Sequence, residues 1–265
     1  MTINKLAYVS TLVGLGGLLG LGLFTPAAYA EMTQGFFSAK SEQSGETLRQ
    51  GLPGRRLGGG TREGEQIFAA NYSYLAALTP SDNLSITTAE QPTLMFHIPA
   101  MTSEQTGELV IRDEKDNMVY ESVFQIGSEG GIMSFDTAED TAMPILSLNE
   151  TYRWYFSIIP DVTDRASDIV VHGNIRRVES EAWLAQQSVD ASEITALSNT
   201  NPLMQARMLY QQANLWHDAA LILDELRQAN PTDEVIAAEW EQLIEFAGLT
   251  AVINMPEPTV QIGLN

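Results

Sequence analysis

The sequence predicts a mainly β protein with a helical C-terminal unit. Two patterns predict this fold class. Between residues 72 and 178, apolar and polar positions alternate in short runs with the period of two that a strand requires, and turn-forming residues separate the runs. After Val178 the hydrophobic period changes to about 3.6 residues, which is the period of an α-helix.

The strand pattern is clearest where Tyr152, Trp154 and Phe156 alternate with more polar positions. No convincing helical pattern lies between the strand candidates, and such a series favours an antiparallel β-sandwich over residues 71–178. The strand candidates are 93–98, 131–135, 152–158 and 168–175. Residues 108–124 are expected to form a hairpin, and 72–78 is a weaker strand candidate.

Tyr152 indicates the kind of sandwich. It opens the aromatic strand and follows Leu146 by six residues. This resembles the tyrosine corner of immunoglobulin-like sandwiches, where the hydroxyl bonds a backbone group just upstream. An ordinary core tyrosine at a strand start is the alternative. Tyr152 and Trp154 are therefore expected to be structural residues of an antiparallel immunoglobulin-like β-sandwich.

Residues 179–250 are expected to form the helical unit. Two short helices are expected at 180–187 and 192–198. A first long helix starts with Asn201 as cap and Pro202 as first residue and runs to about Ala213. A second begins near Trp216 and stops at Asn230 and Pro231, and a third runs from Thr232, expected to cap it, to Gly248.

The first two long helices resemble one tetratricopeptide repeat. Tyr210, Ala219 and Pro231 stand where such a repeat has its tyrosine, its small inter-helix residue and its closing proline. Arg207 departs from the pattern, because a small glycine is usual there. A single repeat cannot bury its own apolar face. We therefore expect a repeat-like helical hairpin and a capping helix that pack on the sandwich, on each other or on a partner.

Charge and cysteine content exclude several classes of function. The chain has 34 acidic and 14 basic side chains and a formal net charge of −20. Nucleic-acid binding is not expected, because it requires a clustered basic surface. The absence of cysteine excludes disulfides, thiolate metal sites and cysteine nucleophiles.

The first 30 residues predict a signal peptide. They contain Lys5, an apolar stretch over 6–24 and the small-residue ending Ala28-Tyr29-Ala30. Cleavage after Ala30 would make the protein extracytoplasmic, either periplasmic or secreted. An uncleaved membrane anchor is the alternative, since about 18 apolar residues can begin to span a bilayer.

Residues 31–70 are expected to be a linker with a glycine- and arginine-rich segment at 51–62 (GLPGRRLGGGTR). Its spacing fits neither a phosphate-binding P-loop nor the dinucleotide fingerprint, so no nucleotide is expected. Glycines allow close backbone approach, and arginine forks suit carboxylates. The segment is therefore expected to dock on the chain's own acidic surface, to bind an external anion, or to remain a free linker. Its candidate residues are Arg55, Arg56, Gly58, Gly59, Gly60 and Arg62.

The remaining side chains give no strong catalytic pattern. The three histidines lack metal-ligand spacing, no metal site is expected, and no G-x-S-x-G motif is present. Three aspartates surround Arg165 in residues 160–168, which predicts a turn held by an Asp–Arg pair, with calcium binding as the alternative. Tyr155 beside Arg153 could serve a sugar-binding face. A tail is expected at 251–265.

Five segments together resemble the domain-of-unknown-function family 928, and Asn174 departs from the tryptophan expected there in many members. The resemblance implies an exported protein, chiefly cyanobacterial, without an assigned activity. We expect a non-catalytic interaction or scaffold protein of the bacterial cell envelope with an envelope protein or a glycan as partner. A carboxylate-dependent hydrolase or carbohydrate-binding protein is the alternative. The segments are 51–62, 89–99, 152–178, 215–231 and 239–249.

Overall fold

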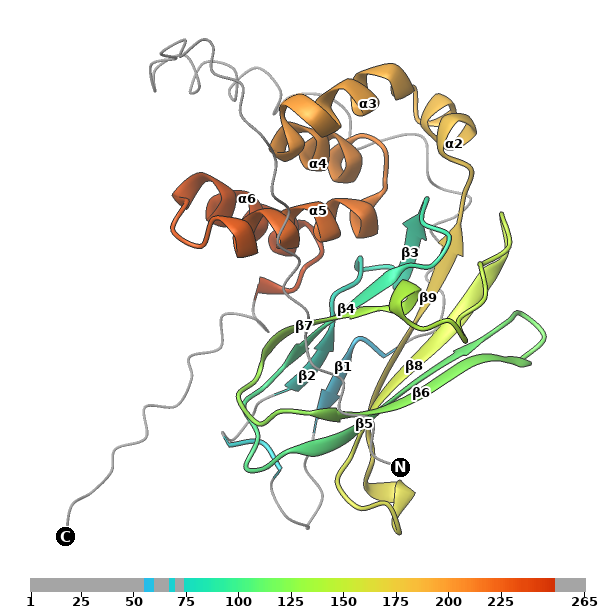
Figure 1. Cartoon of the computed structure of the whole chain (residues 1–265), viewed down its shortest axis with the longest axis vertical. Coiled ribbons are helices and arrows are strands. Elements are labelled where there is room, and N and C mark those ends of the chain that lie inside the picture. Colours follow the sequence, from blue (N-terminus) through green and yellow to red (C-terminus); the bar gives the residue numbers. More distant parts are fainter. Residues whose placement is uncertain (1–54, 60–66, 70–73, 251–265) are drawn as a thin grey trace, which may run out of the picture. The chain divides into compact units, whose positions relative to one another are not determined.

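Two β-sheets and five α-helices make up the part of the chain that the structure describes (Figure 1). The structure is a computed structural model, and it describes residues 55–59, 67–69 and 74–250. These residues belong to one compact unit, Gly45–Asn265. The expected leader and the C-terminal tail at 251–265 lie outside the described residues.

The larger sheet has five strands in the order β3-β9-β8-β5-β6. β3 runs parallel to β9, with Leu84 opposite Asn174, and the other pairs are antiparallel. The expectation of a wholly antiparallel arrangement is therefore wrong at this edge, because strand periodicity carries no information about pairing direction. The strands are β3 (Leu84–Thr87), β9 (Ile169–Arg177), β8 (Thr151–Ile159), β5 (Gln105–Arg112) and β6 (Met118–Ile126).

The smaller sheet has four antiparallel strands in the order β1-β2-β4-β7. β1 lies inside the region expected to be a linker, so the expected linker is wrong for these three residues. Two of the three are glycines, which are unfavourable in strands, and only the pairing with β2 reveals the strand. The strands are β1 (Leu57–Gly59), β2 (Tyr74–Ala77), β4 (Thr93–Ile98) and β7 (Gly131–Asp136).

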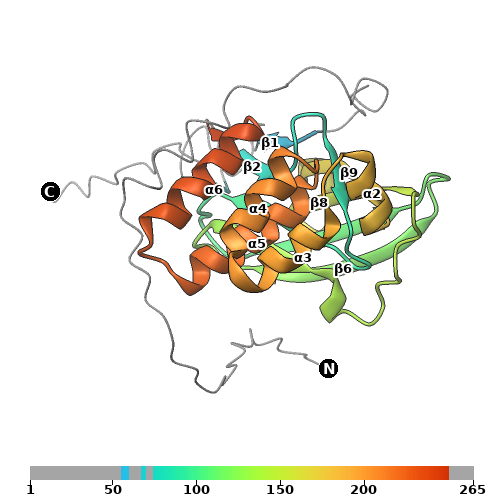
Figure 2. The same ribbon diagram turned by 90° about the horizontal axis from the view of Figure 1, so that it is seen from above.

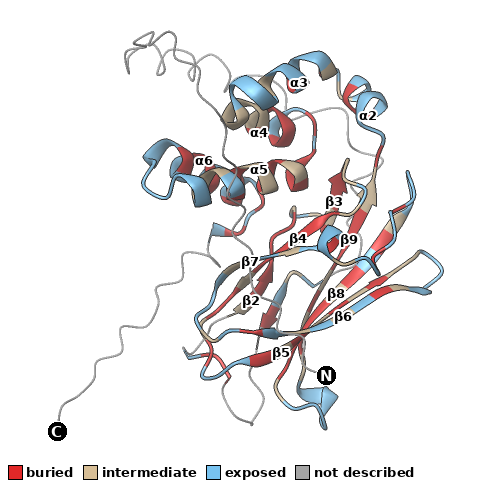
Figure 3. Ribbon diagram, viewed as in Figure 1, coloured by how far each residue is buried: buried red, intermediate tan, exposed pale blue. Residues whose placement is uncertain are grey.

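Both sheets contribute to one hydrophobic core. Phe96 of β4 stacks on Phe156 of β8, with ring centroids 4.1 Å apart, and meets Trp154 edge to face. Trp154 is 1% exposed. Figure 3 shows buried residues along β4, β8 and β9. The alternation from Tyr152 to Phe156 thus places the apolar side chains of β8 in the core and Arg153 and Tyr155 on the other face.

The five helices hold nearly as many residues as the nine strands, so the fold is mixed α and β and the expectation of a mainly β protein is corrected. Two short 3₁₀ turns, η1 (Thr137–Glu139) and η2 (Arg165–Ser167), join the strands. The helices are α2 (Ser180–Gln186), α3 (Ala191–Thr200), α4 (Pro202–Gln211), α5 (Trp216–Ala229) and α6 (Glu234–Phe246).

Helix caps explain most of these boundaries. The Asn201 side chain accepts a hydrogen bond from the Met204 N–H at the start of α4, as expected. The cap of α6 is Asp233 and not Thr232. Its carboxylate accepts from two backbone N–H groups at 2.9 and 3.2 Å. A carboxylate at this place also interacts favourably with the positive end of the helix, which a neutral hydroxyl does not.

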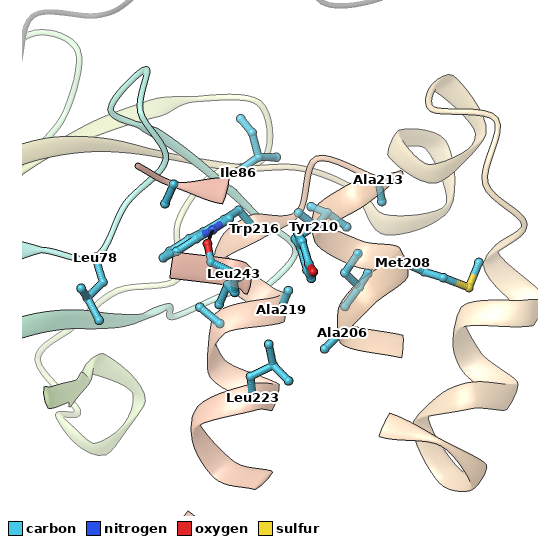
Figure 4. Close-up of a cluster of buried hydrophobic side chains, with 14 of the residues drawn as sticks. Leu78, Ile86, Ala206, Met208, Tyr210, Ala213, Trp216, Ala219, Leu223 and Leu243 are labelled. Carbon is cyan, nitrogen blue, oxygen red and sulfur yellow. Dashed lines mark hydrogen bonds between the residues drawn. The ribbon is translucent and has the colours of Figure 1, made fainter. Parts of the chain in front are cut away.

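A second hydrophobic core joins the helices to the sheets. Trp216 of α5 packs in one cluster with Leu78 and Ile86, and its indole N–H donates to the Leu243 carbonyl of α6 at 3.2 Å (Figure 4). Figure 2 shows α4, α5 and α6 side by side. The apolar face that a single helical hairpin leaves uncovered is thus buried against neighbouring helices and strand residues.

Polar contacts fix α5 to both sheets. The Asp218 carboxylate at its start accepts hydrogen bonds from the Thr87 hydroxyl at 2.5 Å and from the Thr88 N–H and hydroxyl at 2.9 and 2.7 Å. Farther along the helix, buried Asp224 accepts from the Ser134 hydroxyl of β7 at 3.0 Å. The helical unit therefore has a defined orientation on the strands.

Tyr152 has the hydrogen bonds of a fixed corner residue. Its hydroxyl accepts from the Ser147 N–H and donates to the Glu150 carboxylate, both at 3.1 Å. We expect Tyr152→Phe to lower the free energy of unfolding by about 1 kcal/mol, because the Ser147 N–H loses its partner while the ring is kept. Urea denaturation measures this change, with Tyr155→Phe as control for an exposed tyrosine hydroxyl. Equal stability of Tyr152→Phe and wild type would contradict a corner role.

Candidate functional site: an arginine and aromatic cluster

Residues Arg55–Gly59, here called the strap, connect the edges of the two sheets. The Arg55 N–H donates to the His172 carbonyl of β9 at 3.1 Å, and the His172 N–H donates back to the Arg55 carbonyl at 2.9 Å. On the other side, the Ala77 N–H donates to the Arg56 carbonyl at 2.9 Å, and residues 57–59 pair with β2. The strap therefore places Arg55 beside the first half of β9, along which β3 does not pair.

Close packing explains the glycine at position 58. A Cβ atom there would lie 3.0 Å from the Ile169 Cγ2 atom and 3.2 Å from the Val170 carbonyl oxygen. A larger side chain would push the strap away from β9. Gly59 pairs with Tyr74 of β2 through its backbone. Gly60 and Arg62, the other candidates of this segment, lie outside the described residues.

Arg56 docks through a carbonyl group. Its Nη2 atom donates to the Ala247 carbonyl just after α6 at 2.8 Å. Burial lowers the pKa of Arg56, and the negative charge of Asp82 partly opposes this effect. Among the described residues Arg56 forms no ion pair, so the carboxylate partner expected for it is not found there. The unpaired carbonyls at a helix end also accept hydrogen bonds from arginine.

The strap brings Arg55 to a cluster of side chains on β8 and β9. Arg55 and His172 are a hydrogen-bonded antiparallel pair, so their side chains are on the same face of the sheet. His172 is paired in turn with Tyr155, and the two rings stack with centroids 5.4 Å apart. Arg153 donates a long hydrogen bond of 3.5 Å to the Tyr155 hydroxyl. We call Arg55, Arg153, Tyr155 and His172 the arginine–aromatic cluster.

The electrostatics of this cluster are those of a positive site. Partial burial lowers the pKa of His172, and the positive charges of Arg153 and Arg55 lower it further. His172 is therefore mainly neutral at pH 7, since its pKa lies below the usual 6.5. Both arginines are exposed. An anion bound here would be attracted by two guanidinium groups and would also favour protonation of the imidazole.

Five of the other seven arginines of the described residues form ion pairs with carboxylates, and Arg56 and Arg176 do not. The ion pairs join Arg112 to Asp116, Arg165 to Glu108 and Asp168, Arg177 to Glu90, Arg207 to Glu239, and Arg227 to Asp224. In the same part of the chain Arg55 and Arg153 form no ion pair, although the whole protein has 34 acidic side chains. Two unneutralised arginines that converge on one face of so acidic a chain form a surface that can bind an anion.

Arg165 holds the turn before β9, with a partner that the sequence did not indicate. It donates a hydrogen bond to the Asp168 carboxylate at 2.6 Å, as the Asp–Arg hypothesis requires. It also donates to both carboxylate oxygens of Glu108 on β5, at 3.2 and 2.7 Å. Asp164 instead caps η2 by accepting from the Ala166 N–H. Within the described ranges no group of three histidine, aspartate or glutamate side chains could hold a metal ion.

The repeat-like residues belong to the helical unit and not to the cluster. Tyr210 is buried and its hydroxyl donates to Glu239 at 2.8 Å, Ala219 is fully buried, and Pro231 is exposed in the turn after α5. Arg207, the departure from the repeat pattern, pairs with Glu239. A charged residue replaces the small one because the facing helix supplies a buried carboxylate.

The carboxylates also offer one feature that a hydrolase would need. Burial raises the pKa of Glu225, and the negative charges of Asp224 and Asp136 raise it further. The oxygens of Asp224, however, are occupied by Ser134, Gln228 and Arg227. This arrangement holds α5 against β7 and explains the raised pKa without catalysis.

Sequence reasoning found three of the four cluster residues but did not join them. Arg55 was a docking candidate, Arg153 and Tyr155 were a separate surface pair, and His172 was only one of three histidines without metal-ligand spacing. Alternation along β9 places His172 on the outward face. The pairing of residue 55 with residue 172 has no sequence signal, because the two are far apart in the chain.

Comparison with known proteins identifies the family. The chain matches the model of the family described as Domain of Unknown Function (DUF928) over residues 57–257, which include every described strand and helix. No curated protein gave a significant match. Among the described residues, none of the helices has the length and apolarity needed to span a membrane. Because the match covers most of its length, the chain belongs to the DUF928 family.

Proposed function

We propose that this protein is a non-catalytic binding protein of the bacterial cell envelope that binds an anionic ligand through the arginine–aromatic cluster. One observation carries the proposal: Arg55 and Arg153 lie on the same sheet face as Tyr155 and His172 and form no ion pair among the described residues, in a chain of net charge −20. Two exposed guanidinium groups without a carboxylate partner in the described part of the chain, on one face of the sheet, are available to an anionic ligand.

The proposed envelope location rests on the first 30 residues, whose Lys5, apolar stretch and Ala28-Tyr29-Ala30 ending have the order of a secretory signal. An extracytoplasmic location would expose the cluster to envelope polymers. No nucleic-acid or nucleotide partner is proposed, because the net charge opposes the first and no phosphate-binding motif supports the second.

We further propose that the two sheets form an immunoglobulin-like sandwich and that α4 and α5 form a repeat-like hairpin capped by α6. The shared core of the sheets and the Tyr152 hydrogen bonds support the first part. Buried Ala219 and Tyr210 between neighbouring helices support the second. In this view the sandwich is a rigid platform for the cluster, and the helical unit is a structural addition that Arg56 ties to the strap.

Removal of the two arginines tests the proposed function. We expect the double variant Arg55→Ala with Arg153→Ala to lose about tenfold or more in affinity for immobilised acidic polysaccharide, because each charge-assisted hydrogen bond contributes about 1.5–3 kcal/mol. Surface plasmon resonance at low salt measures this affinity. The control is Lys115→Ala, which removes an exposed positive charge from the turn between β5 and β6.

The pattern of loss distinguishes a site from general electrostatics. An equal loss in the Lys115→Ala control would indicate a net-charge effect only. Unchanged binding in the double variant, with thermal stability also unchanged, would show that the cluster is not the anion site.

A further inference from the structure

We propose that the ligand of the arginine–aromatic cluster is a glycan in which one carboxylated sugar adjoins uncharged sugars. This inference rests on the proposed function and names its ligand class. It follows from a row of outward-facing side chains that crosses the sheet. The charge of these side chains changes along the row, and the ligand must match each part of it.

The row contains five side chains on one face of the sheet. Arg55 pairs with His172, His172 with Tyr155, Tyr155 with Val110, and Val110 with Glu121. Directly opposed residues point to the same side of a sheet, so all five side chains face outward together. With neighbouring strands about 4.8 Å apart, the row is about 19 Å long. It changes from positive, through aromatic and aliphatic, to negative.

The positive end selects a carboxylate. Arg55 is in the row and Arg153 lies beside it, bonded to the Tyr155 hydroxyl. A planar guanidinium forms paired hydrogen bonds with the two oxygens of a carboxylate. A single acidic sugar at this end is therefore bound by two arginine forks, with His172 beneath it.

The middle of the row favours an uncharged part of the ligand that presents apolar C–H groups. Tyr155 and Val110 are half-buried and offer an aromatic ring and a branched aliphatic side chain without charge. Sugar rings present C–H groups on their faces and hydroxyl groups at their edges. An uncharged sugar can therefore cover Tyr155 and Val110 while its hydroxyls stay in water or reach the charged ends of the row.

The negative end discriminates against a second acidic group. Glu121 on β6 is exposed, and its carboxylate can only accept hydrogen bonds when ionised. Sugar hydroxyls can donate to it, whereas a second carboxylate would be repelled. The row thus favours one acidic sugar followed by neutral sugars over a chain of acidic sugars.

An acidic peptide fits the row less well. Extended peptides bind sheets by adding a strand to an exposed edge, where backbone groups are free. The cluster instead lies on the face of β8 and β9, which are interior strands of the sheet with neighbours on both sides. Only side chains are available there, and a peptide backbone would gain no strand pairing.

The test measures binding of the full-length protein to four defined probes by isothermal titration calorimetry. The probes are a xylose disaccharide bearing one glucuronic acid, a galacturonic acid trisaccharide, neutral xylotriose and a triglutamate peptide. We expect the single-acid glycan to bind best. The galacturonate should bind about five- to tenfold more weakly, as expected for like charges that meet at a surface.

Glu121→Gln is the decisive variant. We expect it to remove the difference between the two acidic glycans, and the control Glu129→Gln, in the exposed turn before β7, to preserve that difference. Equal or tighter binding of galacturonate or triglutamate by the wild type, or an unchanged difference in Glu121→Gln, would overturn this ligand class. These outcomes differ from failure of the proposed function, in which no acidic probe would depend on Arg55 and Arg153.

Discussion

Replacing Arg207 by methionine is expected to lower the free energy of unfolding by about 3–5 kcal/mol, because it leaves a buried carboxylate without its counter-ion. Glu239 is 1% exposed and extends from α6 to residues of α4. The Arg207 Nε atom donates to its two oxygens at 3.1 and 3.0 Å, and the Tyr210 hydroxyl donates at 2.8 Å. Chemical denaturation followed by circular dichroism measures the loss.

Two comparison variants separate this effect from loss of an arginine in general. Arg112→Met removes a partly exposed arginine whose pair with Asp116 spans 3.8 Å, and we expect a change within about 1 kcal/mol. The double variant Arg207→Met with Glu239→Leu removes both charges and should recover most of the stability. A double variant as unstable as Arg207→Met would show that packing, and not the unpaired charge, causes the loss.

Trp216→Ala is expected to destabilise the protein by about 3–5 kcal/mol, the usual cost of truncating a buried large aromatic side chain. Trp216 is 1% exposed and packs in the core that joins the helices to the strands. The substitution also removes the hydrogen bond from the indole N–H to the Leu243 carbonyl. Thermal unfolding monitored by near-ultraviolet circular dichroism measures the change.

The position of Trp216 predicts how the unfolding transition changes as well. Helices and sheets share this core, so a single cooperative transition at lower temperature is expected for the variant. Phe246→Ala, which truncates an aromatic side chain that is 54% exposed, serves as control and should have a much smaller effect. A stability of Trp216→Ala close to that of the control would contradict a shared core.

The cluster and the two cores are connected through the strap. Arg56 donates a hydrogen bond to the Ala247 carbonyl, just after α6. Arg55 pairs with His172 of β9, and Gly58 packs closely against Val170 of the same strand. A substitution in the helical core is therefore also expected to weaken ligand binding by the cluster, because the strap is held by the end of α6 and by β9.

Local patterns in the sequence were sufficient for most elements. The period of two along β8 and the period of about 3.6 along α5 identified strand and helix, since the buried face of each element needs apolar residues at its own spacing. The pair Asn201 and Pro202 located the start of α4. Thr232 is wrong as the cap because the helix starts one residue later, where the Asp233 carboxylate is a charged acceptor for the N–H groups of Val235 and Ile236. Family membership, likewise, followed from ordered motifs and is confirmed by the match over residues 57–257.

What only the tertiary structure decided is which distant residues meet. The sequence by itself determined that 51–62 is rich in arginine and glycine and that Arg153 and Tyr155 alternate on a strand, because these are properties of neighbours. It could not determine that Arg55 pairs with His172, or that Val110 and Glu121 continue the same row. Pairing register depends on how whole strands align to bury their apolar faces, and a slip of one strand by one residue would turn its side chain in the row to the other face.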